Sequence, residues 1–512
     1  MNYNKKTIIL ILLASLIRGL LACSVELGND EVYYRLYASY LQWNYFDHPP
    51  MVGWLIRLTT LNLNADTELF IRLGAILSAA AATWLIFLCG KKLGNTHTGF
   101  MAACMYTVSI YSSVIAGVFI LPDSPQLVCW LAALYLLIEL TDTKNITSKK
   151  NKLLLLFGLI AGLGMLCKIH TTFLWLGLII YLILYNRKWF LQPFLYVSGA
   201  ITLLFCYPII KWNIDNHFVT YLYHSNRVSI SDSGLDIMSV ISFVTGQFLY
   251  TNPVIFIIII ITLSAALRNN LPIKLSHKRL LLLTALPLIA TAFVISFFKP
   301  VLPHWTGPAY CSLILLAACY FSKRNKKIYT PNKFIPRPII IAGVFSVFFL
   351  IAGVSIIHLF PGTLGNKQTL RLGDGDFTLD MIGWRELENQ FKEIQLKDIK
   401  TKSMKKGAVL LSNKWFPAAH LDYYVARPLH MELLCLGELT DIHQYAWINP
   451  TRKKLQRGDD AYCIIPSNYY YDVQANYSSH FDIKLAPQII EQKRNGLSCR
   501  IFYVWRLKNY KP

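Results

Sequence analysis

Six short clusters of polar residues interrupt a chain that is otherwise strongly apolar. They occupy residues 28–31, 46–50, 121–125, 168–170, 212–217 and 299–305. Together they contain carboxylates, imidazoles and amines, which are the groups that act as general acids and bases and that bind anions. One such cluster indicates little by itself. The clusters can form one site only if the elements between them bring the clusters to one face of the molecule.

The elements between the clusters are apolar stretches of about 15 to 22 residues, and about 20 helical residues cross a bilayer. Hydrophobic residues make up 54% of the 512 and charged residues only 15%, which is too apolar for an ordinary soluble protein. The sequence predicts eleven spans, with residues 240–253 as a candidate re-entrant segment. The spans are residues 7–25, 68–90, 97–118, 125–140, 152–167, 171–186, 192–210, 240–267, 279–298, 307–321 and 338–359.

The basic residues are distributed unevenly between the two sides of these spans. The formal net charge is +22, and in a soluble protein this would indicate nucleic acid. Here the lysines and arginines fill every second loop, for example at Lys91, Lys150, Lys188 and Lys278. By the positive-inside rule these loops are cytoplasmic, so the charge encodes topology and predicts no nucleic-acid partner. The N-terminus is then cytoplasmic, and all six polar clusters lie outside.

Two outer segments are longer than simple turns. The first outer loop has amphipathic stretches at 31–45 and 51–63, which we expect to be helices in the membrane interface. The tail has a helical pattern at 379–399 and strand-like runs at 408–411, 461–465 and 499–505, which predict a small α/β domain. We therefore divide the chain into a transmembrane domain, 1–360, and an outer soluble domain, 361–512. One disulfide among Cys435, Cys463 and Cys499 is left open.

The order of motifs in the first outer loop resembles one known group. The run Asn29-Asp30-Glu31-Val32-Tyr33-Tyr34 is followed by Tyr45-Phe46-Asp47-His48-Pro49-Pro50-Met51-Val52-Gly53-Trp54. This order is similar to that of the bacterial aminoarabinose transferase and protein O-mannosyltransferase superfamily. The likeness continues through Arg72-Leu73, Leu121-Pro122-Asp123, Lys168, Trp212-Asn213 and Pro303-His304-Trp305, and so covers most of residues 1–360.

The resemblance implies a polytopic α-helical membrane protein of the GT-C class, with about 11 to 13 transmembrane helices. It implies an inverting glycosyltransferase that takes its sugar from a polyprenyl (undecaprenyl) phosphate donor and passes it to an extracytoplasmic lipid or glycan acceptor. Lipid A, the lipid anchor of lipopolysaccharide, is the first expectation, and a protein hydroxyl is the alternative. The expected location is the bacterial inner membrane, with the C-terminal domain in the periplasm.

The resemblance also implies roles for individual residues. We predict Asp30 and Glu31 as the catalytic carboxylates, and Asp47 as a residue that lines the site. Asp47 and His48 could hold a divalent metal, zinc or magnesium, although no ligand spacing fixes one. His48 stands where relatives often carry a phosphate-facing lysine, and histidine is only partly charged near neutral pH. The residues predicted to bind donor phosphate or sugar are Arg18, His48, Arg72, Asp123, Lys168, Lys299 and His304.

The chemistry of such a transfer is compatible with these roles. Displacement of a phosphate at an anomeric carbon passes through an oxocarbenium-like transition state. The site therefore needs a carboxylate near the attacking oxygen and cations near the leaving phosphate.

Structural explanations remain open for several of these residues. Asn29 or Asp30 could be a helix N-cap, and Asp123 could cap the next helix. The arginines could extend to the interface, and His304 with Trp305 could belong to an aromatic belt. A transporter or flippase, or a lipid-binding assembly protein, would also be polytopic. Transporters, however, place ionisable groups near the midplane and often show repeated halves, which this sequence lacks.

The alternation of basic loops yields a direct topological prediction. A reporter fused after Lys150 should be active only as a cytoplasmic fusion, and one fused after Gly365 only as a periplasmic fusion. Paired alkaline phosphatase and fluorescent-protein fusions would measure this. A cytoplasmic signal after Gly365 would remove the reason for grouping the outer clusters.

Overall fold

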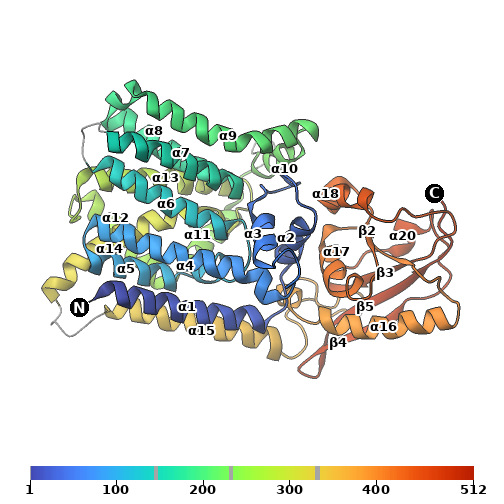
Figure 1. Ribbon diagram of the computed structural model, residues 1–512. Helices are drawn as coiled ribbons and strands as arrows, with labels where there is room; N and C mark the ends of the chain where they lie inside the picture. Colours follow the sequence, from blue (N-terminus) through green and yellow to red (C-terminus); the bar gives the residue numbers. More distant parts are fainter. Residues whose placement is uncertain (1, 143–147, 230–233, 329–334) are drawn as a thin grey trace. The chain divides into compact units, whose positions relative to one another are not determined.

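The computed structural model describes residues 2–142, 148–229, 234–328 and 335–512, with the side chains of 323–328 left aside (Figure 1). The chain forms two compact units. The first unit comprises residues 1–22 and 41–349, and the second comprises residues 23–40 and 350–512. The domain boundary at residue 360 stays a prediction.

The first unit is helical, and its long helices run side by side (Figure 1). Its helices are α1 (Tyr3–Ser24), α3 (Met51–Thr59), α4 (Glu68–Leu93), α5 (Thr96–Val108), α6 (Asp123–Thr141), α7 (Ser148–Cys167), α8 (Thr172–Tyr185), α9 (Pro193–Asp215), α10 (Val219–Val228), α11 (Ile237–Thr251), α12 (Pro253–Leu267), α13 (Leu275–Ser296), α14 (Gly307–Ile328) and α15 (Arg337–Leu359). Within the part of the chain that the structure describes, seven of these are long and apolar enough to cross a membrane: α1, α4, α6, α7, α9, α13 and α15. The chain is therefore a polytopic membrane protein.

Each of the other four predicted spans is also helical, but with a difference. The span predicted at 97–118 is the 13-residue helix α5 followed by a π-helical turn, Tyr111–Ile115, and the span at 171–186 is the 14-residue helix α8. The span at 307–321 lies in α14. The span predicted at 240–267, with 240–253 as a candidate re-entrant segment, is the pair α11 and α12, which meet at an angle of 103°, as in a broken span or a re-entrant loop.

Asn252 explains the bend. Its backbone has φ = 80°, outside the helical region, and Pro253 begins the next helix. The Asn252 side chain is fully buried and donates to Val108 O at 3.1 Å, Ala342 O at 2.9 Å and Ser346 Oγ at 3.0 Å. Its Oδ1 accepts from Val254 N at 3.1 Å, which caps α12. The Asn252 side chain thus forms hydrogen bonds with backbone groups near the break, which water cannot reach inside an apolar bundle.

The second unit contains a five-stranded sheet in the order β2-β1-β3-β5-β4. Its strands are β1 (Val409–Ser412), β2 (Leu433–Cys435), β3 (Ala461–Pro466), β4 (Gln488–Arg494) and β5 (Leu497–Leu507). Strands β2, β1 and β3 are parallel, whereas β5 is antiparallel to both β3 and β4. Helices α16 (Trp384–Lys400), α17 (Trp415–Leu421), α18 (Leu439–Ile442), α19 (Tyr445–Ile448) and α20 (Val473–Tyr477) complete the C-terminal part. This confirms the predicted small α/β domain.

The second unit also includes a helix from the N-terminal part of the sequence, α2 (Asn29–Ser39). The ring of Tyr33 in α2 packs against Trp415 in a tilted arrangement, with ring centroids 4.8 Å apart, and its hydroxyl accepts from Gln444 N at 3.1 Å. Leu27 N donates to Tyr424 Oη at 2.8 Å just before the helix. The aromatic residues expected in the membrane interface are therefore packed inside protein.

The three cysteines considered for a disulfide lie in this unit. Cys435, Cys463 and Cys499 are each buried as free thiols, on or beside strands β2, β3 and β5. No disulfide joins them in the described chain.

The role of Asn252 can be tested by substitution. Asn252→Ala should lower the free energy of unfolding by about 1–3 kcal/mol, because it removes a buried hydrogen-bonding group from a non-helical position. The melting temperature of the protein in detergent measures this. Asn269→Ala is the matched control, since Asn269 also has a positive φ of 53° but is exposed. Equal melting temperatures for the two variants would contradict this account.

Candidate functional site

A buried ion pair lies at the centre of the polar residues in the first unit. Lys168 Nζ lies 2.8 Å from Asp123 Oδ2, and the two side chains are only 5% and 2% exposed. Tyr111, in the π-helical turn, donates its hydroxyl to Asp123 Oδ1 at 2.9 Å. Asp123 is the first residue of α6 and Lys168 follows α7, so two helix ends and one irregular turn converge. We call Asp123, Lys168, Tyr111, His48 and His304 the Asp123 cluster.

Two of the predicted histidines belong to this cluster electrostatically. Burial, then the charge of Lys168, lowers the pKa of His304 to about 4, and Asp123 opposes the shift. Burial, then His224 and Lys168, holds the pKa of His48 well below its ordinary value. Both imidazoles are therefore neutral at pH 7, so they can accept or donate hydrogen bonds there but supply no positive charge.

Residues of α10 surround His48. The Nε2 atom of His224 lies 2.6 Å from the carbonyl oxygen of Asp47, and the rings of His48 and His224 are 6.0 Å apart. Arg227, one turn further on, places its guanidinium 5.4 Å from the Trp305 ring and 5.6 Å from the Tyr223 ring. Arg227 is exposed and contributes to the lowered pKa values of His48 and His304. It is thus an exposed cation beside the cluster.

The two intramembrane arginines and Lys299 have other surroundings. Arg18 and Arg72 are buried, with 3% and 0% of their surface exposed, so neither extends to the interface. Arg18 Nε donates to Ser113 O at 3.2 Å, and Arg72 Nη1 donates to Ala22 O at 2.8 Å, near the C-terminus of α1. A cation at that helix end is favoured by the helix dipole. Lys299 is half-buried in the turn after α13, where its N–H donates to Ile295 O. Phosphate binding by these three stays a prediction.

A metal at Asp47 and His48 is not supported by the residues around them. Zinc sites use three or four protein ligands. Across the described ranges, no group of three or more His, Cys, Asp or Glu side chains could hold a metal ion. The described residues thus offer no zinc site of that kind, and a metal held by Asp47 and His48 stays a prediction.

The predicted catalytic carboxylates lie in the second unit, in the first turn of α2. Gly28 is the N-cap, so neither Asn29 nor Asp30 occupies that position. Glu31 Oε2 accepts from Gly28 N at 2.9 Å, which is the backward half of a capping box. Glu31 thus has a structural role in starting the helix. Asp30 is exposed.

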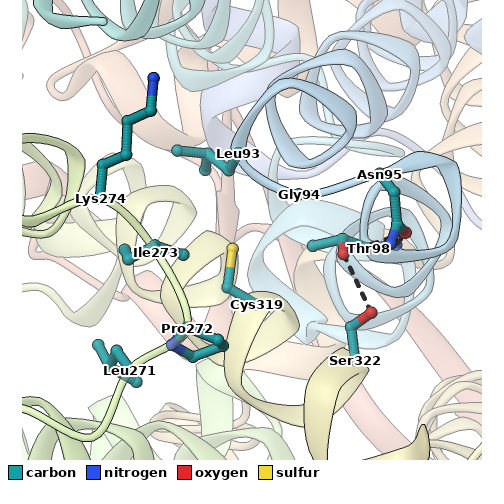
Figure 2. A pocket seen from close by; sticks show the side chains of 10 residues that line it. All are labelled: Leu93, Gly94, Asn95, Thr98, Leu271, Pro272, Ile273, Lys274, Cys319 and Ser322. Atoms are coloured by element: carbon teal, nitrogen blue, oxygen red, sulfur yellow. Dashed lines mark hydrogen bonds between the residues drawn. The ribbon is translucent and has the colours of Figure 1, made fainter.

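Two cavities formed by described residues lie in the first unit. One, of about 400 Å³, is lined by Trp43, Trp54, Leu163, Leu166, Leu204, Phe205 and Pro208. It is almost wholly apolar, and Leu166 is two residues from Lys168. The other, of about 650 Å³, lies between the loops after α4 and before α13, where Thr98 donates to Ser322 (Figure 2). It contains none of the predicted site residues, and its loops are among those that the positive-inside rule predicts to be cytoplasmic.

Comparisons with known proteins show what this chain is similar to. The family model described as dolichyl-phosphate-mannose-protein mannosyltransferase matches residues 47–212, which include Asp47, His48, Arg72, Asp123 and Lys168. Two crystal structures of ArnT from Cupriavidus metallidurans match nearly the whole chain. The apo structure has a TM-score of 0.62 at 14% identity, with 98% of each chain covered. The structure bound to undecaprenyl phosphate has a TM-score of 0.61 at 15% identity, with 97% of each covered.

The fold is of the GT-C class. The lipid A galacturonosyltransferase RgtD of Rhizobium johnstonii is 23% identical over 289 residues, which is 56% of this chain and 59% of that protein. The match thus spans less than two thirds of that curated relative. The resemblance inferred from the order of the sequence motifs is confirmed by these three comparisons.

The structure brings together four of the predicted residues, Asp123, Lys168, His304 and His48. Asp123 is a buried ion-pair partner and not an N-cap, because Pro122 has that position. The sequence interpretation missed Tyr111, His224 and Arg227. The only signal for Arg227 was its place in an outer loop that has few basic residues.

The buried pair can be tested by breaking it from either side. Asp123→Asn or Lys168→Met alone should each cost about 3–5 kcal/mol of stability, because one charge is left buried without its partner. The double variant should recover part of that loss, and melting temperatures in detergent would measure it. Lys211→Met is the control, because it removes an exposed pair with Asp215 and should leave the melting temperature near that of the parent. A double variant that is no more stable than the two losses added would contradict the pairing.

Proposed function

We propose that this protein is an inverting glycosyltransferase that transfers a sugar from undecaprenyl phosphate to lipid A on the periplasmic face of the bacterial inner membrane. The observation that carries the proposal is the likeness to ArnT across 97% of both chains, in a structure that holds undecaprenyl phosphate. The acceptor is supported by the match to a lipid A galacturonosyltransferase.

We assign donor binding to the first unit. Asp123 neutralises the charge of Lys168 and fixes the position of its ammonium group. The remaining N–H groups of that ammonium donate hydrogen bonds to a phosphate oxygen. Arg227, which is exposed and lies near two aromatic rings, supplies positive charge. His48 and His304 donate hydrogen bonds as neutral imidazoles. A histidine at position 48 therefore contacts phosphate without carrying a positive charge. The apolar cavity beneath Trp43 and Trp54 has the chemistry to hold part of a prenyl chain.

We assign acid–base chemistry to Asp30. The acceptor oxygen attacks the anomeric carbon as the bond from that carbon to the phosphate oxygen breaks. The phosphate leaves with the electron pair, and the configuration inverts. A hydroxyl acceptor gives its proton to the Asp30 carboxylate, whereas an anionic acceptor is only oriented by it. Glu31 begins the helix and so holds this turn in place.

The predicted topology supports an outer location for these groups. The basic loops predict a cytoplasmic N-terminus, and an odd number of crossings then puts the C-terminal domain in the periplasm. Lipid A and other envelope glycans are reached from that side.

A protein acceptor is the second candidate. It is favoured by the matching family model, which is described by protein mannosylation and covers residues 47–212. Mass spectrometry of envelope lipids and of periplasmic proteins, from cells with and without this protein, separates the two. A sugar lost from lipid A supports the first candidate, and a sugar lost from a protein supports the second.

Asp30→Asn tests the mechanism. It should reduce sugar transfer by about 10² to 10⁴, the range for loss of a positioned acid–base group. The assay is transfer from polyprenyl-phosphate sugars by purified protein in nanodiscs, with the melting temperature followed in parallel. Glu386→Gln is the matched control, because Glu386 is also an exposed acid in the first turn of a helix in the second unit, and it should transfer at the parent rate.

Two results would count against this function. Parent-like transfer by Asp30→Asn would show that Asp30 serves only the helix. If the parent protein consumes no polyprenyl-phosphate sugar from a broad donor panel, the transporter and assembly functions would gain support.

A further inference from the structure

The segment just before Asp30 is held by the C-terminal part of the second unit. Leu27 contributes both its backbone groups: its N–H donates to Tyr424 Oη at 2.8 Å, and its carbonyl lies 3.0 Å from His420 Nε2. Glu26 N donates to Met381 O at 3.1 Å. This segment therefore has little freedom of its own, and its path is set by residues about 350 to 400 positions away in sequence.

Glu26 also starts a helix of that part. Its carboxylate oxygens accept from Trp384 N at 2.8 Å and Arg385 N at 3.1 Å, the first two backbone donors of α16. The residue in the N-cap position is Gly383, which has φ = 85° and no side chain to offer. A Cβ at Gly383 would lie 1.7 Å from Gln492 Nε2, so only glycine fits there. A carboxylate from residue 26 replaces the missing cap.

Asp380 completes this arrangement at Asn29. Asn29 Nδ2 donates to Asp380 Oδ2 at 2.9 Å, and Tyr469 Oη lies 3.5 Å from Asp380 Oδ1. The backbone carbonyl of Asp380 also lies 2.9 Å from His420 Nε2. The side chain of Asp380 thus contacts Asn29, and its backbone contacts His420, which also contacts Leu27. Burial raises the pKa of the Asp380 carboxyl to about 7, although Arg500 and Asn29 oppose the shift.

Two kinds of contact thus act on the first turn of α2. Glu31 fixes it from inside the helix, and Asp380 fixes it from outside through Asn29. Asn29 is the residue immediately before Asp30 and the first residue of the helix, so its side-chain bond restrains rotation of the turn that carries the Asp30 carboxylate.

We propose that Asp380 is a positioning residue for the transfer reaction, which orients the Asp30 carboxylate by holding Asn29. The proposal rests on the catalytic role proposed for Asp30. Asp380 itself touches neither sugar nor acceptor. Without Asp380, the Asp30 carboxylate would be held loosely. Small displacements of a catalytic group reduce reaction rates by up to about 10²-fold.

The kinetic test uses Asp380→Ala, Asp380→Asn, Asn29→Ala and the double variant Asp380→Ala with Asn29→Ala. Asp380→Ala and Asn29→Ala should each lower kcat by about 10- to 100-fold, with KM for the polyprenyl-phosphate sugar within about twofold of the parent. Asp380→Asn should keep most of kcat, because its amide oxygen still accepts from Asn29. The double variant should lose no more than the worse single variant, since both remove one hydrogen bond.

Asp398→Ala is the matched control. Asp398 is a buried carboxylate of the second unit, whereas Asp380 is half-buried; Asp398 is bonded to Tyr462 and Arg506, and no described contact joins it to residues 26–30. It should lower the melting temperature without a specific loss of kcat. If Asp380→Ala retains the parent kcat, or if the losses in the double variant simply add, the positioning role is overturned.

Hydrogen–deuterium exchange gives a readout that does not need activity. The amides of residues 28–33 should exchange faster in Asp380→Ala than in the parent, and at the parent rate in Asp398→Ala. Unchanged exchange in Asp380→Ala overturns this proposal whether or not the protein transfers sugar. Absence of transfer by the parent protein with every donor overturns the proposed function instead.

Discussion

A charged side chain inside an apolar helical bundle is stable only when opposite charge and hydrogen bonds replace the water that it has lost. The pair between Lys168 and Asp123 meets this condition, with Tyr111 as a third partner. Since the three residues come from the ends of α6 and α7 and from a π-helical turn, satisfying the pair fixes how these elements meet. It also sets the electrostatic environment of His48 and His304, whose lowered pKa values follow from burial and from the charge of Lys168.

The same requirement governs the breaks in the helices. A bend inside the bundle frees backbone groups that no water can reach, so a polar side chain has to serve them. Asn252 does this between α11 and α12. Arg72 meets the carbonyl of Ala22 near the end of α1 for a related reason, because the last carbonyls of a helix lack partners within it. Asn252 and Arg72 thus support the backbone at places where it departs from a continuous helix.

In the second unit, the requirement is met across long sequence distances. Glu26 caps α16, His420 contacts the carbonyl of Leu27, and Asp380 holds Asn29. These bonds make the beginning of α2 part of the fold of the C-terminal domain. The proposed catalytic carboxylate is therefore carried by a helix whose orientation depends on residues more than 300 positions later. Its position thus depends on contacts with the C-terminal part of the second unit.

The sequence alone determined the properties that depend on local composition. Apolar length predicted the helices, basic loops predicted their orientation, and the order of motifs from Asp30 to His304 predicted the fold class. Chain-local patterns could also locate strands β1, β3 and β5. Only the tertiary structure decided which charges meet. Contacts between distant segments pair Asp123 with Lys168, place Arg227 beside the Asp123 cluster, and bond Asp380 to Asn29. The physical reason is that a buried charge is costly without a partner of opposite charge, so a partner has to exist. Packing decides which residue that partner is.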